Sequence, residues 1–217
     1  MLAVGETFQD AQKNLDLSAK YPVILPAAGL YPGQADALQA EEVAAFIREH
    51  RSRLAAIGEV GLDFWLAADE EQKDLQRQVF DQFVHLSQET KLPLNVHSRS
   101  AGRHVVQRLL EKKARKVQLH AFDGKVKYAW PAVEQGFFFS IPPSVLRSRQ
   151  KQKLVSSLPL SCLLAETDSP LLGPEHDARN EPANLTLVVQ ALAEIKKVSP
   201  EYVREALQEN FYQLFEI

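Results

Sequence analysis

Residues 54–64 constrain the fold of this chain more than any other segment. An apolar run too short for a helix, Leu-Ala-Ala-Ile, leads into Glu59, which stands between Gly58 and Gly61. This pattern is typical of a buried strand in a parallel sheet that presents a functional group at its end. The glycines allow a sharp turn and the close approach of a ligand, and a carboxylate in that place can bind a cation.

Three later strand-like runs end in the same way, in His97, His120 and Asp168. Functional groups of α/β barrels gather at the C-terminal ends of their strands. The recurrence therefore predicts that two imidazoles and two carboxylates, contributed by four different strands, meet around one site.

The segments between these runs carry apolar residues at helical spacing, so strands and helices alternate along the chain. Alternation of this kind predicts a parallel sheet. The predicted helices include residues 6–20, 69–90, 102–113, 126–134 and 144–157. The predicted strands begin near Leu2, Val23, Leu54, Leu92, Val117, Phe137 and Cys162. Because seven strands are one short of a closed barrel, we expect an α/β fold of the TIM type, a (β/α)8 barrel lacking its first strand-helix unit. No linker composition divides residues 1–217, which we expect to form a single domain that is incomplete at the N-terminus.

Composition excludes some functions. The net charge of −3 argues against a broad electrostatic grip on nucleic acid, but it allows an enzyme that holds one phosphate through a metal. The single Cys162 cannot form an internal disulfide, which favours a reducing compartment. No apolar segment has membrane-spanning length and the first ten residues lack a secretory core, so we expect a cytoplasmic or nuclear protein that binds no membrane. No obligate protein partner is evident.

The predicted site has the composition of a metal centre. Two histidines with oxygen ligands suit Zn²⁺ or Mn²⁺, and a second ion can be held if Glu59 bridges. A bound divalent ion lowers the pKa of its water to about 7 and neutralises the charge of a phosphodiester. The alternative is that each side chain is a satisfied polar group at the rim of a barrel. Four such residues at four strand ends favour the metal centre.

Residues near these strand ends have two interpretations each. Asp63 can orient a ligand or cap the adjacent loop. Arg99 can meet a phosphate oxygen or form a salt bridge at the rim. Trp65 can stack on a base or cover the barrel mouth.

Five stretches, in this order, resemble the TatD-type metal-dependent deoxyribonucleases, a branch of the amidohydrolase-like TIM-barrel hydrolases. They are Gly58-Glu59-Val60-Gly61-Leu62-Asp63, His97-Ser98-Arg99, His120-Ala121-Phe122, Glu166-Thr167-Asp168-Ser169-Pro170 and Arg179-Asn180-Glu181-Pro182. The resemblance implies divalent metal ions (Zn, Mg or Mn, up to two) and DNA as the substrate, often trimmed from the 3′ end.

The resemblance also implies roles for single residues. Glu59 would be a bridging ligand, His97 and His120 would complete one metal position, and Asp168 would serve the other. Glu59 and Asp168 would be the catalytic residues. The residues expected to bind substrate are Arg99, Asp63, Arg179 and Asn180.

The chain departs from the family pattern in two places. It contains no His-x-His pair, which in the family lies on the first strand and binds the metal shared with Asp168. Gly29-Leu30-Tyr31-Pro32 also has tyrosine where the family tends to have histidine. We therefore expect an intact metal position at Glu59 and a depleted one near Asp168, and we interpret the chain as a shortened product of a longer enzyme.

Two alternatives to a deoxyribonuclease remain. One is a shortened, catalytically weakened barrel that retains at most one metal and acts by binding. The other is an amidohydrolase-like metal hydrolase that acts on an amide or a phosphotriester. An open barrel of this kind would also leave two strand edges unpaired.

Overall fold

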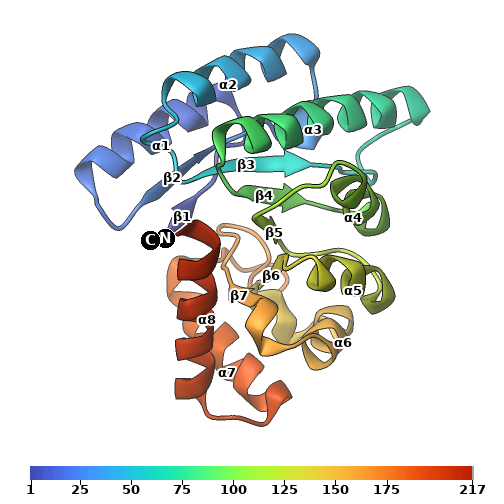
Figure 1. The fold of residues 1–217 in the computed structure, drawn as a ribbon. Helices are drawn as coiled ribbons and strands as arrows, with labels where there is room; N and C mark the ends of the chain where they lie inside the picture. Colours follow the sequence, from blue (N-terminus) through green and yellow to red (C-terminus); the bar gives the residue numbers. More distant parts are fainter. Residues whose placement is uncertain (217) are drawn as a thin grey trace.

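The computed structural model describes residues 1–216, which form one curled sheet of seven parallel strands (Figure 1). Each strand pairs with the next one in the sequence, so the spatial order is the chain order. The strands are β1 (Leu2–Ala3), β2 (Leu25–Ala28), β3 (Ala56–Gly61), β4 (Leu94–His97), β5 (Val117–Leu119), β6 (Phe138–Ile141) and β7 (Leu163–Ala165). The predicted fold class is confirmed: the strands form most of a β/α barrel.

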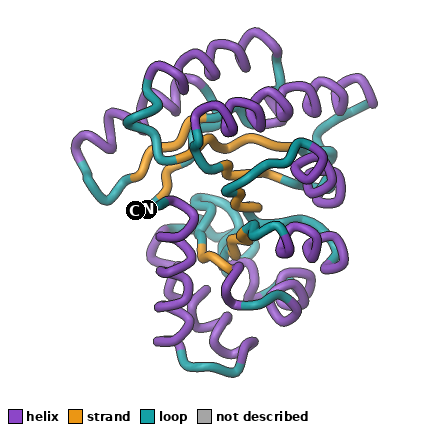
Figure 2. Tube along the Cα trace, in the orientation of Figure 1, coloured by secondary structure: helices purple, strands orange, loops and turns teal. Residues whose placement is uncertain are grey.

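Helices follow the strands, and most of them cover the convex face of the sheet (Figure 2). Within the described residues they are α1 (Phe8–Lys20), α2 (Ala37–Glu49), α3 (Glu70–Thr90), α4 (Gly102–Glu111), α5 (Val126–Glu134), α6 (Arg149–Ser157), α7 (Leu185–Lys196) and α8 (Pro200–Phe215). Side-chain oxygens cap several of the N-termini by accepting a hydrogen bond from the backbone N–H three residues later. These caps are Thr7, Asp36, Asp69, Ser148 and Ser199.

Several predicted elements differ from the structure in extent. The predicted helix over residues 144–157 is a 3-10 turn (Pro143–Leu146) followed by α6, because Ser148 adopts an extended backbone and caps a new helix. The strands predicted from Val23, Leu54 and Leu92 each begin two residues later, at Leu25, Ala56 and Leu94. The side chain of Val23 is 69% exposed, and its carbonyl accepts a hydrogen bond from the amino group of Met1.

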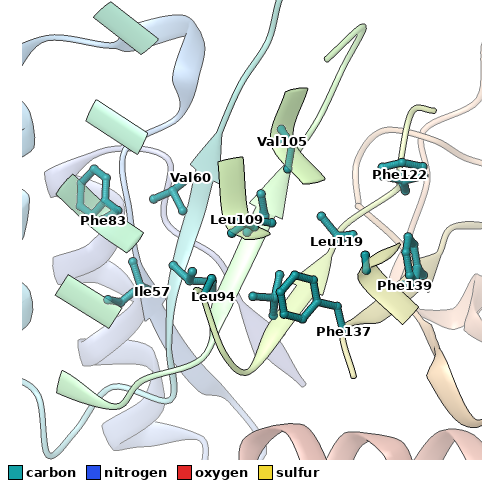
Figure 3. Packing of buried hydrophobic residues seen from close by; sticks show 14 of the residues in the cluster. Ile57, Val60, Phe83, Leu94, Val105, Leu109, Leu119, Phe122, Phe137 and Phe139 are labelled. Atoms are coloured by element: carbon teal, nitrogen blue, oxygen red, sulfur yellow. The ribbon is translucent and has the colours of Figure 1, made fainter. Parts of the chain in front are cut away.

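The larger hydrophobic cluster fills the layer between the strands and the helices. Ile57 and Leu94 face outward from neighbouring strands and are fully buried together with Phe83 of α3 and Leu109 of α4 (Figure 3). Burying side chains of this size stabilises the fold by about 1.5–3 kcal/mol each. This layer therefore fixes the positions of the central strands, on which most of the polar site lies.

A smaller cluster lies inside the curl of the sheet. It comprises Ala27, Ala56, Phe138, Leu164, Leu214 and Phe215, with Leu2, Val4 and Phe211 packed against it. The sheet is not closed within residues 1–216, because β1 and β7 each pair with a strand on one side only. A cavity of about 770 Å³ is bordered by residues of both strands and of α8.

Candidate metal centre

The position of Glu59 follows from an irregularity in β3. Ile57 pairs with Leu94 and Val60 pairs with Val96, so β3 contains one more residue than β4 between these two pairs. The extra residue lets both Ile57 and Val60 pack outward while Glu59 is directed to the interior of the curl. Gly61 completes this turn with φ of 143°, and a Cβ there would overlap with the carbonyl oxygen of His97.

Glu59, His97 and His120 come together from three adjacent strand ends. The Oε1 atom of Glu59 lies 2.6 Å from Nδ1 of His97 and 3.7 Å from Nε2 of His120. One ligand atom from each residue lies within 4.8 Å of the other two. Glu59 and His120 are buried, and the side chain of His97 is 14% exposed. Among residues 1–216, these three form the group whose spacing could hold a metal ion.

Each imidazole is held from behind by a carboxylate. Nε2 of His97 lies 3.1 Å from Oδ2 of Asp63, and Nδ1 of His120 lies 2.8 Å from Oε2 of Glu166. When the imidazole is neutral, a carboxylate that accepts the N–H on one side leaves the other nitrogen unprotonated and able to bind a metal. Both histidines are thus oriented with the free nitrogen toward Glu59.

The two supporting carboxylates are themselves fixed. Asp63 is fully buried, and it accepts hydrogen bonds from the hydroxyl of Tyr31 at 2.7 Å and from two backbone N–H groups of the following loop. Glu166 accepts one from the hydroxyl of Ser140 at 2.6 Å and one from the backbone N–H of Ala121 at 2.8 Å. These contacts restrict the rotation of both imidazoles.

One atom at this site lacks a partner that its burial requires. Nδ1 of His97 is buried and has no hydrogen-bond partner, although Oε1 of Glu59 lies 2.6 Å from it. A buried polar atom without a partner is uncommon and calls for an explanation such as an ion. Two imidazole nitrogens and a carboxylate are ligands that Zn²⁺ and Mn²⁺ accept. The residues present therefore fit a divalent cation.

Charge at the site is concentrated and closely balanced. Burial alone would raise the pKa of Glu59, but His120 and His97 together lower it by more than burial raises it, so the net shift of the pKa is downward. Burial would lower the pKa of His120, but Glu166, Glu59 and Asp168 raise it to about 10. The neighbouring carboxylates thus favour a positive charge in this place, and a cation would supply it.

Asp168 lies on the open side of the same cavity. Its Oδ1 atom is 3.8 Å from Nε2 of His120, its side chain is 23% exposed, and its backbone adopts a left-handed φ of 57°. Burial and then the nearby Glu166 and Glu59 outweigh the effect of His120 and raise its pKa to about 6. Of the four side chains predicted to meet, three form a tight set and Asp168 borders it.

The residues expected to bind substrate have different surroundings. Arg99 is exposed at the rim, with its guanidinium 3.7 Å from the centre of the Trp65 ring. Arg179 is exposed in the loop before α7. Asn180 is 1% exposed, and its amide donates hydrogen bonds to the carbonyls of Thr167 and Leu171. Asp63 is occupied by Tyr31 and His97. The geometry of Asn180 and Asp63 suits positioning of the loop and of His97, respectively.

Sequence reasoning assigned no role to Glu166 or Ser140. Glu166 lies two residues after Leu164, whose side chain points into the curl, and residues two apart on a strand share a face. The alternation could therefore have identified Glu166 as a neighbour of the site. Ser140 carries no comparable signal, because its partner lies 26 residues away in the sequence.

A β/α barrel sheet with carboxylate-supported histidines at its strand ends is the architecture of a metal-dependent hydrolase. The family model described as TatD related DNase matches residues 1–216, and the chain belongs to this family. The predicted resemblance and the predicted class of enzyme are thus confirmed.

Known relatives resemble the chain over almost its whole length. It is 45% identical over 227 residues to the human protein named Deoxyribonuclease TATDN3, covering 99% of this chain and 83% of that protein. It is 32% identical to an uncharacterized metal-dependent hydrolase of Methanocaldococcus jannaschii, covering 97% of this chain and 83% of the relative.

Solved structures share the fold. The crystal structure of YJJV, a TATD homolog from Escherichia coli, superposes with a TM-score of 0.91 at 24% identity, covering 100% of this chain and 86% of that one. None of the helices formed by residues 1–216 combines the length and the apolar character needed to cross a membrane.

Proposed function

We propose that this chain hydrolyses phosphodiester bonds of DNA with a metal-activated water, as an exonuclease acting from the 3′ end. The observation that carries the proposal is the set of Glu59, His97 and His120, in which both imidazoles are oriented by carboxylates, those of Asp63 and Glu166. The name of the human relative, a deoxyribonuclease, supports DNA as the substrate.

Different side chains would have different roles in such a reaction. A divalent ion bound here would lower the pKa of a water to about 7 and neutralise charge on a phosphodiester oxygen. Glu59, His97 and His120 would hold it, and Zn, Mn or Mg are the candidates. Asp168 faces the same cavity and is partly exposed, which places its carboxylate to take a proton from an attacking water. A second ion would require ligands beside Asp168, where the described residues offer fewer.

Positive charge at the rim suits a nucleic-acid end. Arg99 is exposed and lies flat against Trp65, which orders its guanidinium without neutralising it. Arg179 adds a second exposed cation in the loop before α7. One or two such cations can hold a single terminal phosphate, in agreement with a chain of net charge −3.

The test is the substitution Glu59→Ala, compared with His85→Ala, which changes an exposed histidine on α3. Purified protein is analysed for bound metal and assayed on single-stranded and double-stranded DNA labelled at either end, with Mg²⁺, Mn²⁺ or Zn²⁺. We expect Glu59→Ala to lose metal and all metal-dependent cleavage while keeping its circular dichroism spectrum. Full cleavage by Glu59→Ala would remove this residue from the mechanism.

A second candidate follows from the position of Asp168. Because Asp168 stands apart from the tight set, the chain could hold one ion and act by binding rather than by turnover. One ion or none per chain, with no cleavage of DNA under any metal, would support this alternative. Cleavage of an amide or a phosphotriester instead of DNA would support another kind of hydrolase.

A further inference from the structure

The cavity of about 770 Å³ is bordered by the two outermost strands of the sheet. Leu2 and Val4 line it on one side and Leu164 on the other, and Leu207 and Phe211 of α8 form its outer wall. The lining at this level is mostly apolar, and α8 also contributes Arg204, Gln208 and Tyr212 to it. Closer to the metal centre, Glu59, Glu166 and Asp168 also line it.

Both strands direct backbone groups toward this cavity. The carbonyl of Met1 accepts a hydrogen bond from Leu25, and Gly5 exchanges hydrogen bonds with Gly58 and Glu59, all on the side of the sheet. Successive peptide groups of a strand point to opposite sides, so the N–H and C=O groups of Leu2 and Val4 point away from the sheet. These groups need partners other than the paired strands.

The same reasoning applies to β7. The N–H of Glu166 donates to the carbonyl of Ile141 on the paired side, so the N–H and C=O of Ala165 point to the free side. The side-chain amide of Asn210 donates a hydrogen bond of 2.7 Å to the carbonyl of Leu163. The free edge of β7 therefore begins at Ala165, level with the middle of the cavity.

An unpartnered side-chain atom lies in the lining. Asn95 is 4% exposed, it borders the cavity, and its Oδ1 atom has no hydrogen-bond partner. A buried amide oxygen of this kind requires a donor. A purely apolar occupant would supply a donor neither to Asn95 nor to the two strand edges.

We propose that this cavity is an acceptor site for one extended peptide strand, which pairs with β1 on one side and β7 on the other, parallel to both. Its outward side chains would be apolar and pack against Leu207. Its inward side chains would be apolar beside Leu164, and small and polar beside Asn95. Addition of a strand to open sheet edges draws its affinity from backbone hydrogen bonds and its specificity from alternate side chains.

Charge complementarity sets the direction. In a parallel strand the C-terminal end lies nearest the metal centre, where the three carboxylates of Glu59, Glu166 and Asp168 line the cavity. Glu59 and Glu166 face histidines there, so a basic residue at the C-terminal end of the peptide is matched to Asp168 in the metal-free protein. The peptide chosen as a probe is acetyl-Lys-Val-Val-Val-Ser-Val-Ser-Val-Lys-amide, in which the C-terminal lysine shares the inward face with the two serines.

The matched control peptide has proline in place of the third valine. It keeps the charge and nearly all the apolar surface, but it loses one N–H and cannot form a continuous ladder. Binding is followed by titration calorimetry and by the melting temperature of the full chain. Backbone hydrogen exchange locates the bound peptide.

We expect saturable binding of one peptide per chain, a melting temperature that rises with peptide concentration, and slowed exchange of the amides of Leu2, Val4 and Ala165. The proline peptide should bind at least about tenfold more weakly, because it loses one or two hydrogen bonds of the ladder. These readouts require no catalysis, so the proposal stands or falls independently of DNA hydrolysis.

Four results would overturn the proposal. They are no binding by a chain that is folded by circular dichroism, equal binding of the proline peptide, slowed exchange elsewhere than these edges, and a concentration-dependent dimer that protects the same amides without peptide. The last result would assign the edges to a second copy of the chain.

Discussion

The two sides of the candidate site differ in how firmly their side chains are held. The strands β3 to β5 pair with neighbours on both edges and carry Glu59, His97 and His120, and the buried Asp63 behind His97 directly follows β3. Within residues 1–216, β7 and β1 each pair on one edge only; the residues after β7 supply both Glu166, which is hydrogen-bonded to His120, and Asp168, which projects into the cavity. The difference teaches that three adjacent strands can bring one set of metal ligands together, whereas the support of His120 depends on the segment that follows the outermost strand β7.

The largest expected difference between the two sides is in packing. Phe83 is fully buried behind β3, whereas Phe211 is partly exposed at the cavity and contacts Phe215 with ring centres 4.6 Å apart. Phe83→Ala should lower the free energy of unfolding by about 3–5 kcal/mol, since it leaves a cavity in a close-packed layer. Phe211→Ala should cost about 1 kcal/mol, because part of its surface is already in contact with solvent.

Urea denaturation of both variants, analysed with a common slope, measures these free energies. Equal losses would mean that the open side is packed as firmly as the closed side. The two sides of the site would then not differ in packing.

The next largest effect concerns the support of His120. Glu166 accepts hydrogen bonds from His120, Ser140 and Ala121 with its two oxygens. Glu166→Gln replaces one of these oxygens by an NH2 group, which faces a donor and leaves it unpaired. We expect metal affinity to fall about 10- to 100-fold, the usual effect of removing a partner of a ligating histidine.

Asp168→Asn is the matched change two residues farther along the same segment after β7. It also neutralises one carboxylate, but Asp168 is 3.8 Å from the nearest histidine nitrogen and supports no ligand. Titration of the metal-free proteins with Zn²⁺ should show a smaller loss for Asp168→Asn than for Glu166→Gln. The reverse order would place the tighter metal position beside Asp168.

Sequence patterns predicted the parts of this molecule that depend on local order. The seven strands and the end of each of the runs carrying Glu59, His97 and His120 follow from apolar periodicity, because burial on the convex face imposes it. The confirmed fold class then brings these strand ends to one edge of the sheet. Glycine at position 61 indicated the sharp turn that its left-handed backbone makes.

Features that depend on contacts between residues far apart in the chain could not be predicted from sequence patterns. Nothing near Asn180 in the sequence shows that its amide donates hydrogen bonds to the carbonyls of Thr167 and Leu171. The additional residue of β3 against β4 is likewise a property of the pair of strands. The role of Glu166 arises from His120, which lies 46 residues away.

The smallest effect tests how far the support of His97 extends. Tyr31 donates a hydrogen bond of 2.7 Å to Asp63, and burial, together with Asp63, raises the pKa of its hydroxyl, which therefore remains a donor. Tyr31→Phe keeps the ring, which contacts His97 edge to face at 5.1 Å, and removes only this hydrogen bond. Asp63 retains the backbone N–H groups of the loop and His97 as donors. We therefore expect a loss of about 1 kcal/mol, or roughly fivefold in Zn²⁺ affinity.

Tyr202→Phe is the control for Tyr31→Phe, since Tyr202 lies exposed on α8 and also loses only a hydroxyl. Zn²⁺ affinity by calorimetry should be unchanged in the control and weakened in Tyr31→Phe, while urea denaturation without metal separates a loss of affinity from a loss of stability. An unchanged affinity would limit the support of His97 to Asp63 alone. A loss of Zn²⁺ affinity greater than that of Glu166→Gln would show that the support of His97 is less redundant than the support of His120. The hydroxyl of Tyr31 alone would then control the orientation of His97, which Asp63 was expected to fix.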